Sequence, residues 1–172
     1  MQSKFRKHLQ HRRVRLALEF AVLLLIVFAV KTWMQRDMVE GIPPPIEGTL
    51  LNGEVFDLRS MGGKPVLLHF WATWCAICKL EQDSIEAISQ DHTVITIAMQ
   101  SGPVDDIKDY MSKHGLKFPV LADEQGDLAR RYGVHAVPAS FIINPAGRIS
   151  FRETGYTTEW GLRVRLWLTQ LF

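Results

Sequence analysis

The stretch VLLHFWATWCAICKLE, Val66 to Glu81, decides the fold expected for this chain. Its first six residues form a mostly apolar run, which predicts a buried β-strand. A helix is predicted next, because apolar residues recur on roughly one face of a helical pattern: Ile77, Leu80, Ile85 and Ile88. The junction between the predicted strand and the predicted helix carries both cysteines of the sequence, Cys75 and Cys78.

The Cys-x-x-Cys spacing of Cys75 and Cys78 puts both sulfurs about one turn apart at one helix start. Unpaired N–H groups and the positive end of the helix dipole favour the thiolate form of the first cysteine. Thiols in this motif commonly have a pKa of ~3.5–7.5, against ~8.5 for a free thiol. The dipole supplies ~0.3–1 kcal/mol, less than one pKa unit, so hydrogen bonds and neighbouring charges must supply the rest. We expect Cys75 to be exposed and acidic and Cys78 to be shielded.

A cysteine pair can also bind a metal or form a purely structural disulfide. A zinc site takes about four ligands, and the sequence has no second cysteine pair. A purely structural disulfide closing so short a loop would constrain the unfolded chain little. No lone peroxidatic cysteine precedes a separate resolving cysteine, which disfavours a peroxiredoxin. A module that carries Cu(I) stays open as the main rival, because soft thiolates suit that ion.

The charge of the chain is unevenly distributed. The net charge is +2, but six basic residues precede the first acidic residue, Glu19: Lys4, Arg6, Lys7, Arg12, Arg13 and Arg15. Without those six, 14 lysines and arginines stand against 18 acidic residues, a net charge of −4. The body of the protein is therefore mildly acidic and has no nucleic-acid footprint.

Leu16 to Met34 is a mostly apolar stretch with Glu19 and Lys31 near its ends. A bilayer core takes ~20 helical residues, so residues 16–34 are predicted to be a transmembrane anchor. The basic segment, residues 1–15, predicts a cytoplasmic N-terminus and a body outside the cytoplasm. A cleaved signal peptide is the competing interpretation, but its best cleavage residue, Ala29, lies inside the apolar run. Two cysteines at redox spacing fit an oxidising compartment.

The 172 residues suffice for one domain plus this appendage. Residues 35–45 are predicted to be a linker in which three consecutive prolines, residues 43–45, act as a stiff spacer. Residues 46–172 are predicted to form the folded domain, which opens with a hairpin over 49–58 that turns at Asn52-Gly53.

Strands and helices are predicted to alternate through the rest of this domain. Extended segments are expected at 93–98, 118–121, 140–143 and 148–153. Helices are expected up to His114, over 128–132 and from Thr158 onward, the last with Leu162, Leu166 and Trp167 inward. This order, with a closing hairpin, predicts an α/β sandwich with a mixed central sheet.

Residues 70–79, FWATWCAICK, resemble the active-site signature of the thioredoxin superfamily, and Glu81 resembles an acidic residue of its membrane-tethered, extracytoplasmic branch. Over about residues 42–170 the chain is most similar to the suppressor-of-copper-sensitivity protein D group of disulfide reductases. The resemblance implies a thioredoxin-like three-layer sandwich on a single-pass anchor in a bacterial inner membrane, facing the periplasm. It also implies protein disulfide substrates, a transmembrane reductase as electron donor, a link to copper tolerance, and no cofactor beyond a Cys75–Cys78 disulfide.

The resemblance assigns roles to individual residues. Cys75 is implied to be the attacking thiol and Cys78 the resolving thiol, with Trp74 shielding and presenting Cys75. Val137 and Pro138 are implied to bind substrate through a cis peptide bond that faces the cysteines. Proline is the residue at which a cis bond is cheap, and its missing N–H leaves the neighbouring backbone free to pair with an extended substrate.

Two buried or charged positions have two interpretations each. His69 either accepts the proton of Cys78 or is a core histidine bonded to a backbone carbonyl. Glu81 either tunes the pKa of the thiols or is a charge on the helix surface. Trp71 is expected in the core.

One departure from the family matters for the expected chemistry. Many members have proline just before the second cysteine, where this chain has Ile77, so the redox potential and direction do not carry over. The expected activity is thiol–disulfide oxidoreduction, with reduction of protein disulfides favoured. A disulfide oxidase, a cytochrome c maturation reductase and a copper-binding module are the alternatives.

Overall fold

The computed structural model describes the backbone of residues 2–171 and the side chains of residues 15–171. The chain divides into two units, Met1–Arg36 and Asp37–Phe172. The first unit is the long helix α1 (Gln2–Gln35), within which Arg15–Gln35 is long and apolar enough to cross a membrane. This stretch coincides with the predicted anchor. The side chains of the predicted basic segment lie outside the described residues, apart from Arg15.

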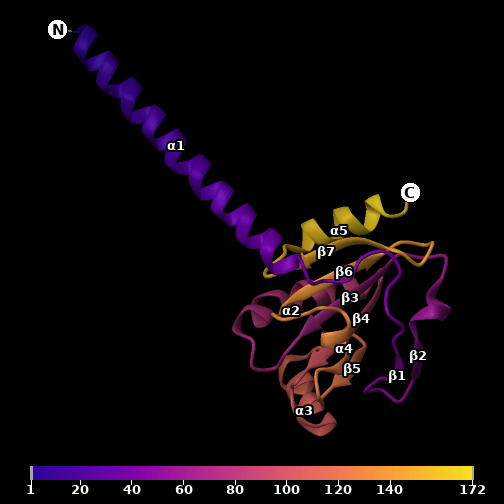
Figure 1. Ribbon diagram of the computed structural model, residues 1–172. Helices are drawn as coiled ribbons and strands as arrows, with labels where there is room; N and C mark the ends of the chain where they lie inside the picture. Colours follow the sequence, from indigo (N-terminus) through magenta and orange to yellow (C-terminus); the bar gives the residue numbers. More distant parts are fainter. Residues whose placement is uncertain (1, 172) are drawn as a thin grey trace. The chain divides into compact units, whose positions relative to one another are not determined.

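The second unit is built on a five-stranded mixed sheet with the strand order β5-β4-β3-β6-β7 (Figure 1). Its strands are β3 (Val66–Trp71), β4 (Thr93–Met99), β5 (Val120–Asp123), β6 (Ala139–Ile143) and β7 (Ile149–Thr154). The first three are parallel, and β6 runs antiparallel to both β3 and β7. The predicted α/β class with a mixed sheet is confirmed, and β3 has the predicted bounds.

Helices and the N-terminal segment cover the two faces of the sheet and give the predicted three-layer sandwich. Its helices are α2 (Ala76–Ser89), α3 (Val104–His114), α4 (Asp127–Arg131) and α5 (Glu159–Leu168). Side chains of α2, α3 and α5 pack in one hydrophobic cluster, and those of α4 pack in the other. Successive residues of β3 alternate between the two clusters because side chains of a strand point to opposite faces.

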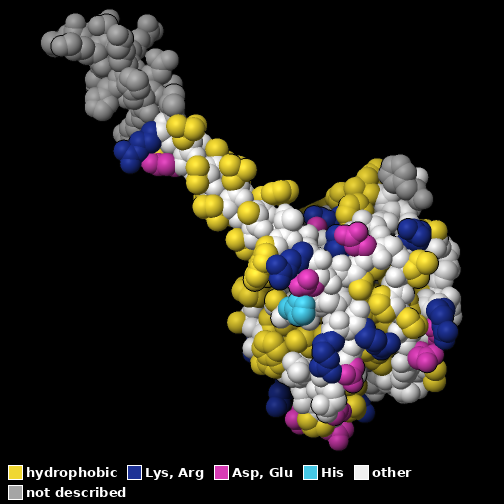
Figure 2. All heavy atoms as spheres, viewed as in Figure 1, with side chains coloured by type: hydrophobic (Ala, Val, Ile, Leu, Met, Phe, Trp, Pro, Cys, Tyr) yellow, Lys and Arg dark blue, Asp and Glu magenta, His cyan; other side chains and the backbone are white. Residues whose placement is uncertain are grey.

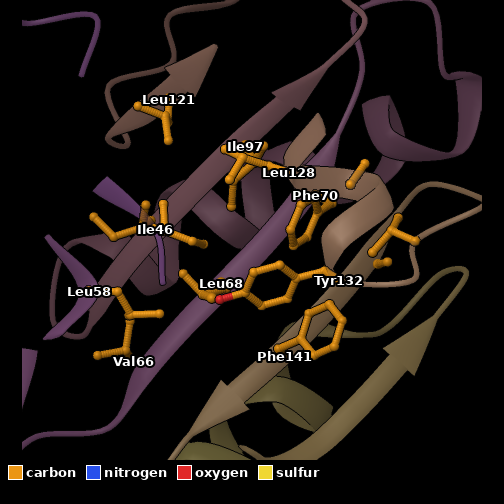
Figure 3. Packing of buried hydrophobic residues seen from close by; sticks show 14 of the residues in the cluster. Ile46, Leu58, Val66, Leu68, Phe70, Ile97, Leu121, Leu128, Tyr132 and Phe141 are labelled. Carbon is orange, nitrogen blue, oxygen red and sulfur yellow. The ribbon is translucent and has the colours of Figure 1, made fainter. Parts of the chain in front are cut away.

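The cluster on the α4 side contains a group of aromatic rings. Phe70, Tyr132 and Phe141 point toward one another (Figure 3), with ring centroids 5.1–5.8 Å apart. Ile46 and Leu58 extend this cluster toward the N-terminal hairpin. These residues tie the segment before β3 to the central sheet.

The predicted hairpin is present, but it spans residues 47–57 in place of the predicted 49–58. It consists of β1 (Glu47–Thr49) and β2 (Val55–Asp57), which pair antiparallel around a turn that contains Gly53 at φ +89°. A 3₁₀ helix, η1 (Leu58–Met61), follows. The backbone N–H of Leu51 donates to the carbonyl of Val120, so the hairpin is attached to β5, at one edge of the main sheet.

Residues 37–45, predicted to belong to a spacer, pack against the domain instead. Met38 is only 3% exposed and lies in the α4-side cluster. The Tyr132 hydroxyl donates to the carbonyl of Pro44 at 2.7 Å, and the N–H of Ile149 donates to the carbonyl of Gly41 at 2.7 Å. Burial of an apolar side chain and these hydrogen bonds hold a proline-rich segment that composition alone predicts to stand free.

Two predicted helix faces need correction. In α2 the buried face contains Cys78, Glu81, Ile85 and Ile88, whereas Ile77 and Leu80 are exposed. In α5, Leu162 and Leu166 are buried as predicted, but Trp167 is exposed. Apolar spacing identifies a helix, but the packing of the helix against the sheet decides which of its faces is buried.

Candidate active site

The end of β3 and the start of α2 hold the cysteine pair. After β3 the chain turns at Ala72, whose carbonyl accepts a hydrogen bond from the N–H of Cys75 at 3.2 Å. Cys75 is the N-cap residue of α2, and its Sγ accepts a hydrogen bond from the N–H of Cys78 at 3.1 Å. A disulfide joins Cys75 to Cys78, so the structure has the oxidised form of the pair.

Exposure does not distinguish the two cysteines in this form. Cys75 is 6% exposed and Cys78 is 3% exposed, so the expectation of an exposed Cys75 is wrong for the disulfide state. The difference between them lies in the backbone. Cys75 Sγ is the sulfur at the helix start that receives an N–H group, which is the environment that stabilises a thiolate after reduction.

Trp74 lies next to Cys75 and is exposed, with its ring fastened to the loop after β4. The indole Nε1 donates to the carbonyl of Gln100 at 3.0 Å, and the N–H of Thr73 donates to Ser101 Oγ at 3.1 Å. Gln100 has a left-handed backbone, with φ +45°. Sequence reasoning missed Gln100 and Ser101. The available signal was topological, because the C-terminal ends of the parallel strands β3 and β4 meet at one edge of the sheet.

The loop before β6 forms the other side of the site. The Val137–Pro138 peptide bond is cis, and the carbonyl oxygen of Val137 lies 3.5 Å from Cys75 Sγ. The pairing of Phe70 with Ala139 in the antiparallel β3–β6 ladder brings this loop to the end of β3. A stretch 62 residues from Cys75 in sequence therefore lines the disulfide.

Glu81 is buried on the inner face of α2, one turn after Cys78, and the interpretation as a surface charge is wrong. Its Oε1 accepts a hydrogen bond from the N–H of Thr157 at 3.0 Å. Within the described part of the chain, Oε2 has no hydrogen-bond partner. Burial raises the pKa of the carboxyl group to about 7, although the Thr157 hydrogen bond acts in the opposite direction. A carboxyl group with a raised pKa thus lies on the buried face of α2, one turn after Cys78.

His69 lies in the middle of β3 and is buried. Its Nδ1 is 2.9 Å from Ser140 Oγ, because the β3–β6 register pairs these two residues. Burial lowers the pKa of the imidazole to about 3, so the ring is neutral at physiological pH. The structure therefore favours the core interpretation, with a serine hydroxyl as partner in place of the expected backbone carbonyl.

Trp71 is buried as expected, and its Nε1 donates to Thr96 Oγ1 at 3.0 Å. Residues 15–171 contain no cluster of His, Cys, Asp or Glu side chains that could hold a metal ion.

A mixed five-stranded sheet with a Cys-x-x-Cys disulfide at the start of α2, faced by a proline loop, defines a thioredoxin-like protein. Comparison with known families agrees with this class. Residues 42–152 match the AhpC/TSA family, and the chain belongs to that family.

Individual relatives cover most of the chain. It is 30% identical over 150 residues to the "Thioredoxin-like protein" of Haemophilus influenzae, covering 86% of this chain and 89% of that one. It is 28% identical over 163 residues to the thiol-disulfide oxidoreductase ResA of Bacillus subtilis, with the same two coverages. The crystal structure of the exposed lipoprotein thioredoxin Etrx1 of Streptococcus pneumoniae matches with a TM-score of 0.65 and 26% identity, covering 73% of this chain and 99% of that one.

Proposed function

We propose that this protein is a membrane-anchored thiol–disulfide oxidoreductase that reduces protein disulfides outside the cytoplasm. The observation that carries the proposal is the position of Cys75 Sγ. It accepts the N–H of Cys78 at the start of α2 and lies 3.5 Å from the Val137 carbonyl. The relatives named thiol-disulfide oxidoreductase support the same activity.

The reaction uses the two sulfurs in sequence. In the reduced protein, the Cys75 thiolate attacks one sulfur of a substrate disulfide, forms a mixed disulfide and releases the other substrate sulfur as a thiolate. Cys78 loses its proton and attacks Cys75 Sγ, which breaks the mixed disulfide, releases the second substrate sulfur as a thiolate and restores the Cys75–Cys78 bond. Two electrons pass from the cysteine pair to the substrate, and the reaction ends in the oxidised form described above.

Four other residues support this reaction. The exposed Trp74 is proposed to present Cys75, and Val137 with Pro138 to offer backbone to an extended substrate. Glu81 is the group best suited to accept the proton of Cys78, because its pKa of about 7 lets it exchange protons at neutral pH. His69 takes no part in this proposal, since its pKa of about 3 makes it a poor base.

The cycle needs a donor that reduces the cysteine pair again. We assign residues 1–15 to the cytoplasm, residues 16–34 to the inner membrane and the second unit to the periplasm of a bacterium. The candidate span Arg15–Gln35 supports the anchor, and the basic residues before it support this orientation. A transmembrane reductase is the proposed electron donor, and no bound cofactor is required.

Within this class, the chain's resemblance over residues 42–170 supports membership of the suppressor-of-copper-sensitivity protein D group. The associated proposal is a role in copper tolerance. Deletion of the gene should lower the copper concentration that the cell tolerates, and the wild-type gene should restore it whereas a Cys75→Ser copy should not. Unchanged tolerance after deletion contradicts the copper role and leaves the activity unaffected.

The activity itself is tested by trapping. In Cys78→Ser, Cys75 still attacks but the mixed disulfide is not resolved, so partner proteins stay attached in adducts that reductant removes. Cys75→Ser is the matched control and should trap nothing. If neither variant traps a partner, while the wild type binds Cu(I) tightly and fails to reduce insulin disulfides, the protein is a copper carrier and the oxidoreductase proposal is wrong.

A further inference from the structure

The point where the chain enters the second unit is fixed on β7. The Met38 carbonyl accepts a hydrogen bond from Arg152 Nη1 at 2.8 Å, and its Sδ accepts one from Thr154 Oγ1 at 3.1 Å. The candidate span ends at Gln35. Two residues, Arg36 and Asp37, separate Gln35 from Met38, and the three Cα–Cα steps between them reach about 10 Å when the chain is extended.

The candidate span has no surplus residues that could extend beyond the hydrocarbon core and lengthen this connection. Its 21 helical residues measure about 32 Å at 1.5 Å per residue, which matches a hydrocarbon core about 30 Å thick. With α1 in a bilayer, as the proposed function has it, Gln35 lies at the boundary of the hydrocarbon. Met38, which is buried in the domain, is then held within the layer of lipid headgroups or just above it.

Helix α5 packs against the same strand that holds Met38. Arg165 of α5 forms an ion pair with Glu153 of β7 at 2.7 Å, while the neighbouring Arg152 and Thr154 bind Met38. In Figure 1, α5 lies alongside β7 within the second unit. Met38 and α5 are therefore both attached to β7.

The outer face of α5 is apolar over its whole length. Trp160, Val164 and Trp167 are 78%, 50% and 58% exposed and follow the i, i+4, i+7 spacing of one helix face. Tyr156 before the helix and Leu171 after it are exposed as well. We call Trp160, Val164 and Trp167 the α5 stripe. Figure 2 shows hydrophobic side chains gathered along this edge of the domain.

The charged side chains of α5 are directed away from this stripe. Arg163 pairs with Asp91 and Glu159, and Arg165 pairs with Glu153. No charge of the helix thus interrupts the apolar face within the described part of α5. Tryptophan is the residue enriched where protein meets the membrane–water interface, because its ring is apolar and its N–H remains hydrogen-bonded.

We propose that the α5 stripe docks into the interfacial layer of the outer leaflet of the same bilayer that holds α1. The short connection to Met38 brings the domain to that surface, and the uncharged, tryptophan-rich face of α5 is the part fitted to enter it. The proposal rests on the membrane anchoring of the proposed function.

Docking would also set the position of the active site. The N–H of Thr157, just before α5, binds Glu81 near the start of α2, and Arg163 Nη2 of α5 donates to the carbonyl of Ala87 farther along α2. The two helices therefore run in the same direction. A docked α5 holds the start of α2, with the disulfide, at a fixed height above the lipid, within reach of a membrane-embedded electron donor.

Lipid quenching of tryptophan fluorescence tests the proposal on the full chain. The protein is reconstituted into vesicles of phosphatidylcholine and phosphatidylglycerol, with or without bromine on the acyl carbons near the headgroup. Docking predicts that the double variant Trp160→Phe, Trp167→Phe loses a large part of the emission that brominated lipid quenches. Unchanged reduction of insulin disulfides by the double variant verifies that the fold is intact.

Two further variants separate docking from anchoring. Trp33→Phe reports on α1, because Trp33 lies in the candidate span. Val55→Trp is the control for the domain surface, since Val55 is 85% exposed on β2 and the hairpin is attached to β5, at the opposite edge of the sheet from β7. Its added emission should resist quenching.

Each combination of results decides the two proposals. Quenching of Trp33 together with Trp160 and Trp167 supports docking and anchoring. Quenching of Trp33 alone overturns docking and leaves the anchor. If the double variant then also forms a smaller oligomer than the wild type, the occupant of the α5 stripe is a second copy of the chain. Quenching of Trp160 and Trp167 without Trp33 supports docking and overturns the anchor. Quenching of none overturns both.

Discussion

The backbone N–H of Thr157 donates a 3.0 Å hydrogen bond to Oε1 of Glu81, 76 residues earlier in the chain. This bond joins the loop before α5 to the catalytic helix α2 and gives a buried carboxyl group its one hydrogen bond among the described residues. A single N–H does not compensate for the loss of water around a carboxylate, so the pKa of Glu81 rises to about 7.

Glu81 is predicted to make the protein less stable as the pH rises from about 4.5 to about 7. Over this range the unfolded glutamate has lost its proton while the folded one keeps it, so the free energy of unfolding falls, by about 3 kcal/mol in total. Glu81→Gln should remove most of this pH dependence. Urea unfolding of the oxidised protein at pH 5 and pH 8 measures it.

An exposed residue provides the control for this prediction. Glu124→Gln removes one carboxylate from the surface and should leave the difference between pH 5 and pH 8 as in the wild type. If Glu81→Gln also retains the wild-type difference, Glu81 is ionised in the folded protein at neutral pH and the proposed proton transfer is wrong.

His69 is predicted to make the protein less stable as the pH falls, whereas Glu81 makes it less stable as the pH rises. Its pKa of about 3 in the folded protein lies below the ordinary value of 6.5, so the unfolded chain binds the extra proton between these values and stability falls as the pH falls. At pH 5 the loss amounts to about 2 kcal/mol. His69→Gln should be less sensitive to acid than the wild type between pH 7.5 and pH 5. Glu81 contributes equally to the pH dependence of the wild type and of His69→Gln, so it does not affect the comparison of their free energies of unfolding.

The matched change for His69 is His114→Gln, at an exposed histidine, which should preserve the wild-type sensitivity to acid. Urea unfolding at pH 7.5 and pH 5 provides both comparisons. Equal acid sensitivity of the wild type and His69→Gln would show that the imidazole accepts a proton within the folded core.

Gly133→Ala should destabilise the domain by about 3 kcal/mol or more. Gly133 has φ +66°, and a Cβ placed there would lie 1.8 Å from the carbonyl oxygen of Asp37 and 3.0 Å from Met38 Cα. The substitution must push residues 37–38 off the domain. Thermal unfolding of the full chain in detergent micelles measures the loss.

Gly147→Ala separates this clash from backbone strain. Gly147 has a similar φ of +76°, but a Cβ there meets no atom within 4 Å. This variant should lose only about 1 kcal/mol from its left-handed backbone. Equal losses for the two variants would mean that residues 37–38 contribute nothing to the packing of the domain.

Cys75 should react before Cys78 when the reduced protein is alkylated. Its sulfur is the one that accepts the N–H of Cys78 at the helix start, so its apparent pKa should fall below ~8.5. Iodoacetamide labelling across a pH series, with the modified cysteine identified by mass spectrometry, provides the measurement. Faster labelling of Cys78 would reverse the proposed roles of attack and resolution.

Local patterns in the sequence were enough to predict most elements of the fold. The apolar run of β3, the β-branched run of β4, the Asn-Gly turn of the hairpin and the glycine that ends α3 each have their structural cause within a few neighbouring residues. The Cys-x-x-Cys motif was located for the same reason, because its chemistry depends on the spacing of two residues at a helix start.

Contacts between distant residues decided the rest. Periodicity identified α2 as a helix but not its rotation, which buries Glu81 and exposes Leu80. Composition predicted a proline-rich spacer, but the hydrophobic contact of Met38 and its hydrogen bonds to β7 hold that segment on the domain. The partners of His69, Trp74 and Glu81 lie 71, 26 and 76 residues away and meet them only through the strand register and helix packing. Residue types and spacing thus determined which chemistry the chain carries. The tertiary structure alone decided which groups lose water, and desolvation is what shifts the pKa values of Glu81 and His69.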